Sequence, residues 1–185
     1  TNKIDLKMYC IKCGSLTIKV CPEGDNRERD VCNSCGYIHY NNPKIIVGVL
    51  PVTENFESIL LCKRSIDPGN GKWTIPSGFM ELKESLEDGA QREAKEEANL
   101  EVKLLKLYST YSIINIDQVY LTYLGKILNS DYAAMDETSE VKLFDINKLP
   151  WDEIAFSSVS FILKKYISDH EDGKTFKFHS NYREL

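Results

Sequence analysis

The feature that most constrains this 185-residue chain is the stretch Gly78–Leu100, which reads GFMELKESLEDGAQREAKEEANL. Leu86, Ala90, Ala94 and Ala98 recur in it at every fourth position. Residues at this spacing share one face of an α-helix, and side chains as small as alanine let that face approach a sheet closely. The stretch therefore predicts an amphipathic helix packed against a β-sheet.

Signals at both ends of the stretch delimit this helix. Ser85 suits the N-cap, with Asp88 three residues later in a weaker version of the capping box. Asn99 suits a left-handed residue at the C-terminus. Gly78 is expected in a Pro76-Ser77-Gly78 turn, where the missing Cβ would let the backbone approach a ligand and its carbonyl join a metal shell.

The polar face of the predicted helix carries Glu93, Glu96 and Glu97. Glu93 and Glu97 are one turn apart, about 6 Å along the axis, so the three carboxylates repel one another unless a positive charge lies among them. Mg²⁺ or Mn²⁺ would supply that charge through oxygen ligands and would recruit a phosphorylated substrate. The alternative is a solvated acidic helix face.

Two Cys-x-x-Cys-Gly motifs, at Cys10/Cys13 and Cys32/Cys35, lie near the start of the chain with 18 residues between them. Two such motifs can close a tetrahedral Zn²⁺ site, so this segment predicts a zinc ribbon with structural zinc. A redox Cys-x-x-Cys pair or two disulfides are the alternatives. The remaining thiols, Cys21 and Cys62, are expected to be free, and His39 is an alternative zinc ligand.

The chain is long enough for one domain and a small module, which we place at 1–41 (zinc ribbon) and 42–185, with a linker at Asn41-Asn42-Pro43. A net charge of −5 counts against general binding of nucleic acid. The longest apolar run, Ile45–Leu50, is too short to cross a bilayer, and no signal peptide is visible. We therefore expect no membrane association and a cytoplasmic location.

Hydrophobic patterning predicts the remaining elements. The expected strands are 45–52, paired as a hairpin with 58–64, then 102–114, 118–127, 141–144 and a final edge strand at 176–179. A helix at 155–168 is expected on the other side of the sheet.

Several charged residues outside the helix are candidates for the same site. Lys63 and Arg64 end a strand and could hold substrate phosphate, or could be plain strand-end charges. Glu140 is our first choice for a loop glutamate that acts as a base or additional metal ligand, and Glu137 is the second. Solvated loop charges are the alternative for both.

The spacing in the central stretch resembles the Nudix box, with Asn99 at a position where the family has Gly. The matching residues are Gly78, Glu84, Arg92, Glu93, Ala94, Glu96, Glu97 and Leu100. The resemblance implies an α+β fold, an α/β/α sandwich around a mixed sheet, that hydrolyses a nucleoside diphosphate linked to another group. It also implies that Mg²⁺ ions bridge Glu93, Glu96 and Glu97 to the pyrophosphate, while Arg92 pairs with Glu84 and steadies the carboxylates.

The combination with a zinc ribbon resembles the branch of this family that includes the NADH pyrophosphatases and, more closely, the plant FAD and ADP-ribose pyrophosphatase and its bacterial relatives. The residues that carry the closer resemblance are Cys10-Ile-Lys-Cys-Gly, Asn42-Pro-Lys, Leu61-Cys-Lys-Arg64, Trp73-Thr-Ile-Pro76, Ala155-Phe-Ser-Ser158 and Phe176-Lys-Phe-His179. The Ser-Gln-Pro-Trp-Pro-Phe-Pro stretch of NADH pyrophosphatases is absent.

By this resemblance ADP-ribose or FAD is the expected substrate, AMP is a product, and a homodimer is expected. Aromatic stacking is expected to hold the base, with Phe79, Tyr108, Tyr111 and Tyr120 as unranked candidates. A hypothesis of another class is a non-catalytic regulator that senses a nucleotide and binds partners through its ribbon. The complete set of box carboxylates disfavours it.

Overall fold

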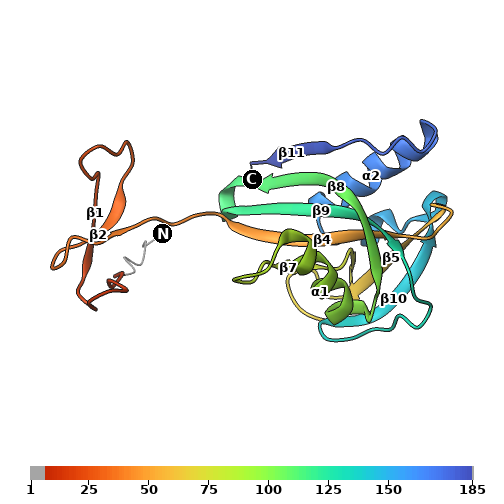
Figure 1. The fold of residues 1–185 in the computed structure, drawn as a ribbon, viewed down its shortest axis with the longest axis horizontal. Helices are drawn as coiled ribbons and strands as arrows, with labels where there is room; N and C mark the ends of the chain where they lie inside the picture. The colour runs from red at the N-terminus through yellow and green to blue at the C-terminus, as the bar shows by residue number, and fades with distance from the viewer. Residues whose placement is uncertain (1–6, 185) are drawn as a thin grey trace. The chain divides into compact units, whose positions relative to one another are not determined.

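The computed structural model describes residues 7–184, which form two compact units that divide between Asn42 and Pro43 (Figure 1). The first unit is a small antiparallel sheet of β1 (Thr17–Val20), β2 (Arg29–Cys32) and β3 (Ile38–His39), in that order. Cys21 lies in the connection between β1 and β2, as expected.

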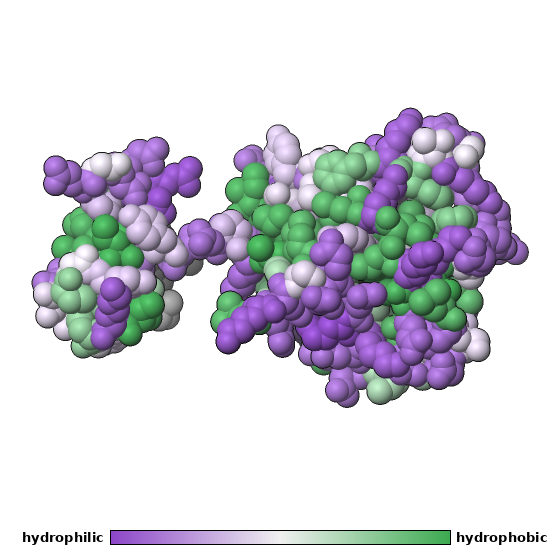
Figure 2. All heavy atoms as spheres, viewed as in Figure 1, coloured by the Kyte–Doolittle hydropathy of each residue, from purple (hydrophilic) through white to green (hydrophobic). Residues whose placement is uncertain are grey.

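The first unit contains almost no apolar core. Its buried residues, within the described part 7–42, are Cys10, Asp30, Cys32 and His39. Larger apolar side chains such as Ile11 and Ile18 are exposed instead, and Figure 2 shows apolar side chains at the surface of this unit. Hydrophobic burial therefore contributes little to the stability of this unit.

The second unit is built on one eight-stranded mixed sheet. Its main path runs β10-β5-β4-β9-β8-β11, with the short strand β6 paired to β5 and β7 paired to β4. The bounds are β4 Lys44–Val52, β5 Ser58–Arg64, β6 Trp73–Thr74, β7 Ser77–Phe79, β8 Val102–Ile113, β9 Gln118–Ile127, β10 Thr138–Asp145 and β11 His179–Arg183. The β4–β9 and β8–β11 pairs are parallel, whereas the other pairs are antiparallel.

Helix α1 (Leu86–Ala98) and helix α2 (Ser157–Glu171) cover opposite faces of this sheet (Figure 1). Alternating residues of β4 serve the two faces, because successive strand side chains point to opposite sides. Val49 belongs to the cluster that contains Ala94 and Ala98 of α1, whereas Leu50 packs in the cluster of α2. Short 3₁₀ helices follow β8 at Ile114–Ile116 and β10 at Ile146–Lys148. A third, Trp151–Glu153, lies between the second and α2.

The expected α+β sandwich with a mixed sheet is therefore confirmed, but several elements differ from expectation by more than one residue. Gly78 lies in β7, paired with Val47, and not in a turn. Strand β10 begins at Thr138, so Glu140 is a strand residue that pairs with Lys63. Helix α2 spans Ser157–Glu171 where 155–168 was expected, and the edge strand β11 begins at His179, where the expected strand ended.

No helix in the described residues is long and apolar enough to cross a membrane.

Candidate functional site

Helix α1 begins and ends as its sequence predicts. The Ser85 hydroxyl accepts a hydrogen bond from the Asp88 amide (3.1 Å), and the Asp88 carboxylate accepts one from the Ser85 amide (3.4 Å). This reciprocal arrangement satisfies two amide groups at the helix N-terminus. Asn99 adopts the left-handed conformation, with φ 48°, at the C-terminus. The caps fix the length and rotation of the helix that carries the box glutamates.

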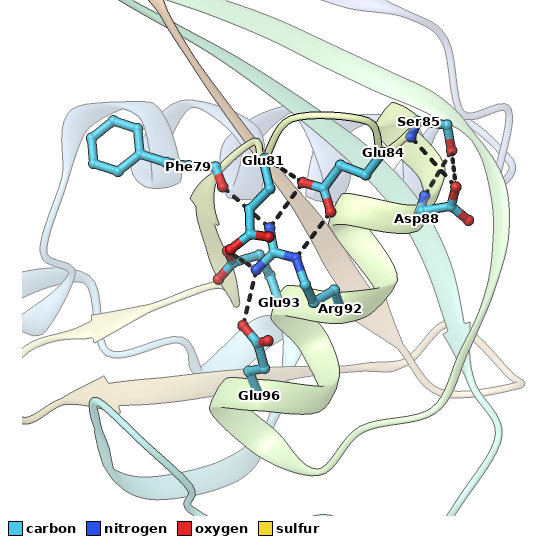
Figure 3. Close-up of polar contacts among 8 residues, drawn as sticks. All are labelled: Phe79, Glu81, Glu84, Ser85, Asp88, Arg92, Glu93 and Glu96. Atoms are coloured by element: carbon cyan, nitrogen blue, oxygen red, sulfur yellow. Dashed lines mark hydrogen bonds and ion pairs between the residues drawn. The ribbon is translucent and has the colours of Figure 1, made fainter.

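Arg92 connects this helix to the loop before it (Figure 3). Its guanidinium donates two hydrogen bonds to Glu84 (both 3.0 Å) and one to the Phe79 carbonyl (3.1 Å). Its Nη1 also contacts Glu93 Oε1 (2.7 Å) and Glu96 Oε2 (2.9 Å). The expected Arg92–Glu84 pair is present, and its hydrogen bonds lower the pKa of Glu84 to about 2. The positive charge beside Glu93 and Glu96 is thus supplied by Arg92.

The three box glutamates have different environments. Glu93 and Glu97 are each only 8% exposed, whereas the Glu96 side chain is exposed. Burial raises the pKa of Glu97 to about 8, and the nearby charge of Glu93 adds to the effect. Burial also raises the pKa of Glu93, although Arg92 opposes that shift. Two adjacent buried carboxylates with raised pKa values are suited to a cation, because a bound positive charge would stabilise their ionised forms.

Gly78 provides the space that Glu93 occupies. A Cβ built at Gly78 would lie 2.3 Å from Glu93 Oε1, closer than real side chains approach one another. The backbone of Gly78 has no positive φ, so conformational freedom is not the reason for glycine here. The expectation of a turn is wrong at this position, because Gly78 lies in β7, and the missing Cβ leaves space for the Glu93 carboxylate.

A cavity of about 460 Å³ begins at Ser77 and Gly78 and extends to the start of α2. Most of its wall is apolar and aromatic, and three of the four expected stacking residues, Phe79, Tyr111 and Tyr120, line it. The fourth, Tyr108, does not. It is fully buried, and its hydroxyl donates to Asp169 at 2.8 Å. Of the four unranked candidates, Tyr108 is therefore not available for base stacking, because long-range packing places its side chain in the core.

Arg64 also lines the cavity, in an orientation that its neighbours fix. Its Nε donates to the Pro68 carbonyl (2.7 Å), and its guanidinium carbon lies 5.2 Å from the centroid of the Phe156 ring. Lys63, considered beside it in the sequence, is not among the lining residues and pairs with Glu140 at 3.5 Å. Of the two strand-end cations, the structure brings only Arg64 to the cavity.

The two glutamates proposed for the later loop are separated by the fold. Glu137 lines the cavity, and its charge contributes to the raised pKa values of Glu93 and Glu97. Its φ of 61° is a left-handed value that non-glycine residues seldom adopt, and such backbone is concentrated at functional sites. Glu140 instead lies in β10 beside Lys63.

Sequence reasoning missed part of the cavity. Gln118 and Thr122 line it together with Tyr120, and these three alternate residues of β9 share one face of the sheet. That alternation was visible in the sequence, but nothing in it identified which face would be hollow. Ser158 of α2 also lines the cavity and was noted only as part of a branch-specific run.

The first unit brings its four motif cysteines together. Their sulfur atoms lie within 4.8 Å of one another, the one such group of three or more possible metal ligands among residues 7–184. Separations of 3.4 Å (Cys13–Cys32), 3.6 Å (Cys13–Cys35) and 3.7 Å (Cys10–Cys35) approach the value of about 3.8 Å that a tetrahedron with Zn–S bonds of about 2.3 Å requires. All six cysteines of the chain are free.

Backbone geometry supports the same cluster. Gly14 and Gly36, which follow the two motifs, have φ values of 72° and 70°, a conformation that suits glycine. The amides of both glycines close tight turns onto the carbonyls of Cys10 and Cys32. His39 is buried but is not part of the group of possible metal ligands found in the described residues.

Residues 42–162 match the profile of the NUDIX domain family, about two thirds of the chain. The chain belongs to the Nudix family. Residues 8–41 match the family profile described as Nudix N-terminal, the zinc ribbon found in some Nudix proteins. The Nudix box recognised in the sequence therefore lies within a Nudix domain, and the chain is a Nudix hydrolase.

Among its relatives, this Nudix hydrolase is 30% identical to an ADP-ribose pyrophosphatase of Methanocaldococcus jannaschii, covering 76% of this chain and 81% of that protein. It is 27% identical to the NAD-capped RNA hydrolase NudC of Vibrio atlanticus, covering 77% of this chain but only 51% of NudC. A crystal structure of a NUDIX hydrolase from Nitrosomonas europaea superposes with a TM-score of 0.90 at 43% identity, covering 96% of this chain and 99% of that one.

Proposed function

We propose that this Nudix hydrolase is a pyrophosphohydrolase that uses Mg²⁺ or Mn²⁺ to cleave a nucleoside diphosphate linked to a second group, with release of AMP. ADP-ribose and FAD are the favoured substrates, and NADH is the alternative. The observation that carries the proposal is the position of Glu93 and Glu97, which are buried beside Ser77 and Gly78 where the cavity begins. A diphosphate bound there would leave the rest of the substrate in the cavity.

The metal ligands in this proposal are Glu93, Glu96, Glu97 and the carbonyl of Gly78. Such a set consists of oxygen atoms alone, which suits a hard divalent cation. When bound, the cation neutralises charge that develops on the diphosphate and lowers the pKa of the attacking water.

The other residues of the site bind or position. Arg92 and Glu84 hold Glu93 and Glu96 in place through the contacts described above, so both are positioning residues. Arg64 is proposed to contact substrate phosphate, since its Nε is already held by Pro68 while its terminal nitrogens have no such partner in the described residues. Phe79 is proposed to contact the substrate at the mouth of the cavity.

We place Glu137 ahead of Glu140 as the glutamate near the reacting water. Its location at the cavity and its electrostatic influence on Glu93 and Glu97 support this order. Glu140 is paired with Lys63, which leaves it as the second choice.

The ribbon, residues 1–41, is proposed to hold one structural Zn²⁺ through Cys10, Cys13, Cys32 and Cys35, because four thiolates leave no open position for water. Residues 42–185 are proposed as the catalytic domain. Six free thiols suit a reducing cytoplasm. Homodimer formation stays a prediction, which light scattering tests.

The central test is hydrolysis of a substrate panel with Mg²⁺: ADP-ribose, FAD, NADH and, because of the similarity to NudC, NAD-capped RNA. We expect the highest kcat/KM for ADP-ribose or FAD, with AMP as a product. Glu97→Gln should lower kcat by about 10²- to 10⁴-fold while the fold is retained. Glu101→Gln, at an exposed position near Lys95, is the matched control and should leave kcat unchanged.

Near-normal turnover in Glu97→Gln would refute the proposal that the box glutamates hold the metal of a pyrophosphohydrolase. The competing hypothesis of a non-catalytic regulator predicts no hydrolysis of any member of the panel, together with binding of a nucleotide and of a partner through the ribbon.

A further inference from the structure

The two helices of the Nudix domain begin in different ways. Helix α1 starts with the Ser85–Asp88 capping box and two acidic residues in its first turn. Helix α2 starts after Phe156, which offers no side-chain cap, and has no acidic residue in its first turn. In the described part of the chain, no acceptor is found for the amides of Ser157 and Ser158. The N-terminus of α2 therefore retains donors that are unused within the protein.

The start of α2 borders the cavity, because Phe156, Ser158 and Val159 line it. Ser158 is a second and independent sign of a ligand. It is only 7% exposed, and its Oγ is buried with no hydrogen-bond partner in the described residues. By contrast, the neighbouring Ser157 hydroxyl accepts from Arg183 Nη1 at 3.2 Å. Buried hydroxyl groups nearly always form a hydrogen bond, so an unpaired hydroxyl beside a cavity indicates that a ligand supplies the partner.

A rotation about χ1 moves a serine hydroxyl between staggered positions, so Oγ of Ser158 can turn toward an acceptor that enters the cavity. Two further hydroxyls on neighbouring strands line the same cavity. They belong to Ser109 and Thr122, which are opposite each other in the β8–β9 ladder. The cavity lining therefore includes several neutral hydrogen-bonding groups, from Ser158 of α2 and from this pair on the sheet.

The rest of the cavity indicates what these groups would meet. Its walls are aromatic and aliphatic, with Tyr111, Tyr120 and Phe156 among them. Its charged residues are one cation, Arg64, and two acids, Asp67 and Glu137. The acids outnumber the cation in the lining as a whole, and Arg64, which lies beside Phe156, is assigned above to the substrate phosphate. A flat apolar ring that presents a ring nitrogen or a carbonyl oxygen matches both the walls and the donors.

We propose that Ser158 and the free amides at the start of α2 form a subsite that donates hydrogen bonds to an acceptor on the nucleobase of the substrate. The proposal rests on the proposed function to the extent that the substrate is a nucleotide. Ser158 is then a residue that determines base specificity and is remote from the carboxylates that act on the diphosphate.

The test is equilibrium binding to the full-length protein, with AMP, GMP, CMP and UMP as probes and ribose 5-phosphate as a probe without a base. Ser158→Ala should weaken binding of the preferred nucleotide about three- to tenfold, the value of one hydrogen bond. Affinity for ribose 5-phosphate should not change. Ser160→Ala, two residues later in α2 and outside the cavity lining, is the matched control and should bind like wild type.

A stability measurement separates this role from a structural one. Since the Ser158 hydroxyl has no partner among the described residues, Ser158→Ala should leave the melting temperature of the free protein unchanged or raise it. The proposal would be overturned if Ser158→Ala bound the preferred nucleotide as tightly as wild type does. It would also be overturned if the wild-type protein bound none of the four nucleotides. The binding assay does not depend on turnover, so the two proposals can fail separately. If the protein hydrolysed none of the dinucleotides but still needed Ser158 to bind a nucleotide, the proposed function would be refuted and the base subsite would stand.

Discussion

Gly78 and Glu93 show how closely single residues of the Nudix box depend on one another. The Glu93 carboxylate occupies the volume that a side chain at position 78 would need, while Arg92 Nη1 holds its Oε1 at 2.7 Å. Arg92 is itself held by Glu84 through two hydrogen bonds. The position of Glu93, a candidate metal ligand, thus depends on the absence of a side chain at Gly78 and on the Arg92 guanidinium, which Glu84 holds in turn.

Gly78→Ala tests this dependence. The added Cβ meets only the end of a flexible side chain, so the carboxylate can shift and the domain should still fold. Because displacement of the Glu93 carboxylate would move a candidate metal ligand away from its position, we expect kcat to fall about 10- to 100-fold. Steady-state kinetics and the melting temperature check both parts. Wild-type kcat in Gly78→Ala would show that Glu93 does not need this space.

At the scale of elements, a buried carboxylate links helix α2 to strand β11 and to the sheet. Asp169 Oδ2 accepts hydrogen bonds from the Tyr108 hydroxyl (2.8 Å) and the Lys177 amide (2.9 Å) and contacts His179 Nε2 (2.9 Å). Burial alone would raise the pKa of Asp169, but these contacts outweigh it and hold the pKa below its ordinary value. The ionised form is therefore the one that stabilises the fold.

The lowered pKa of Asp169 predicts how its contribution varies with pH. A carboxyl group with a depressed folded pKa stabilises fully above its unfolded value of about 3.9, and this stability is lost as the pH falls toward the folded value. Asp169→Asn should lower the free energy of unfolding at pH 7 by about 1–3 kcal/mol. The difference from wild type should shrink below about pH 4.

Urea unfolding at pH 7 and pH 3.5 measures this difference. Asp172→Asn, an exposed position just after the same helix, is the control and should match wild type at both values. A difference for Asp169→Asn that does not vary with pH would mean that its charge plays no part.

The elements that could be predicted from sequence are those with strong local patterns. Strand β9 was expected with its observed bounds, and both caps of α1 follow from residues within the helix or directly beside it. Strands β10 and β11 begin where distant partners allow pairing, at Arg64 and Ser109, which no local pattern reveals. The same limit applies to the site. Each residue that Arg92 contacts lies within 13 positions of Arg92 in sequence, whereas the contact that buries the Tyr108 hydroxyl is made with a residue 61 positions away.

At the scale of the whole molecule, the two units are stabilised by different means. The Nudix domain has buried clusters on both faces of its sheet. The first unit buries two cysteines, an aspartate and a histidine among its described residues, so we infer that a metal ion bound by the four-cysteine cluster stabilises it in place of an apolar core. A structural zinc site can supply about 10–16 kcal/mol of apparent free energy in small peptides, enough to replace a core.

Cys32→Ser should therefore unfold the first unit while the Nudix domain keeps its structure. In the full-length protein we expect hydrogen exchange to lose protection in residues 7–42 and to stay slow in β4 and α1, while bound zinc falls from one ion per chain. The matched control is Cys21→Ser, because Cys21 is exposed and lies outside the sulfur cluster. Its zinc content and protection should equal those of wild type. If wild-type protein contained no zinc, or if Cys32→Ser kept its protection in residues 7–42, metal would not be what holds this unit together.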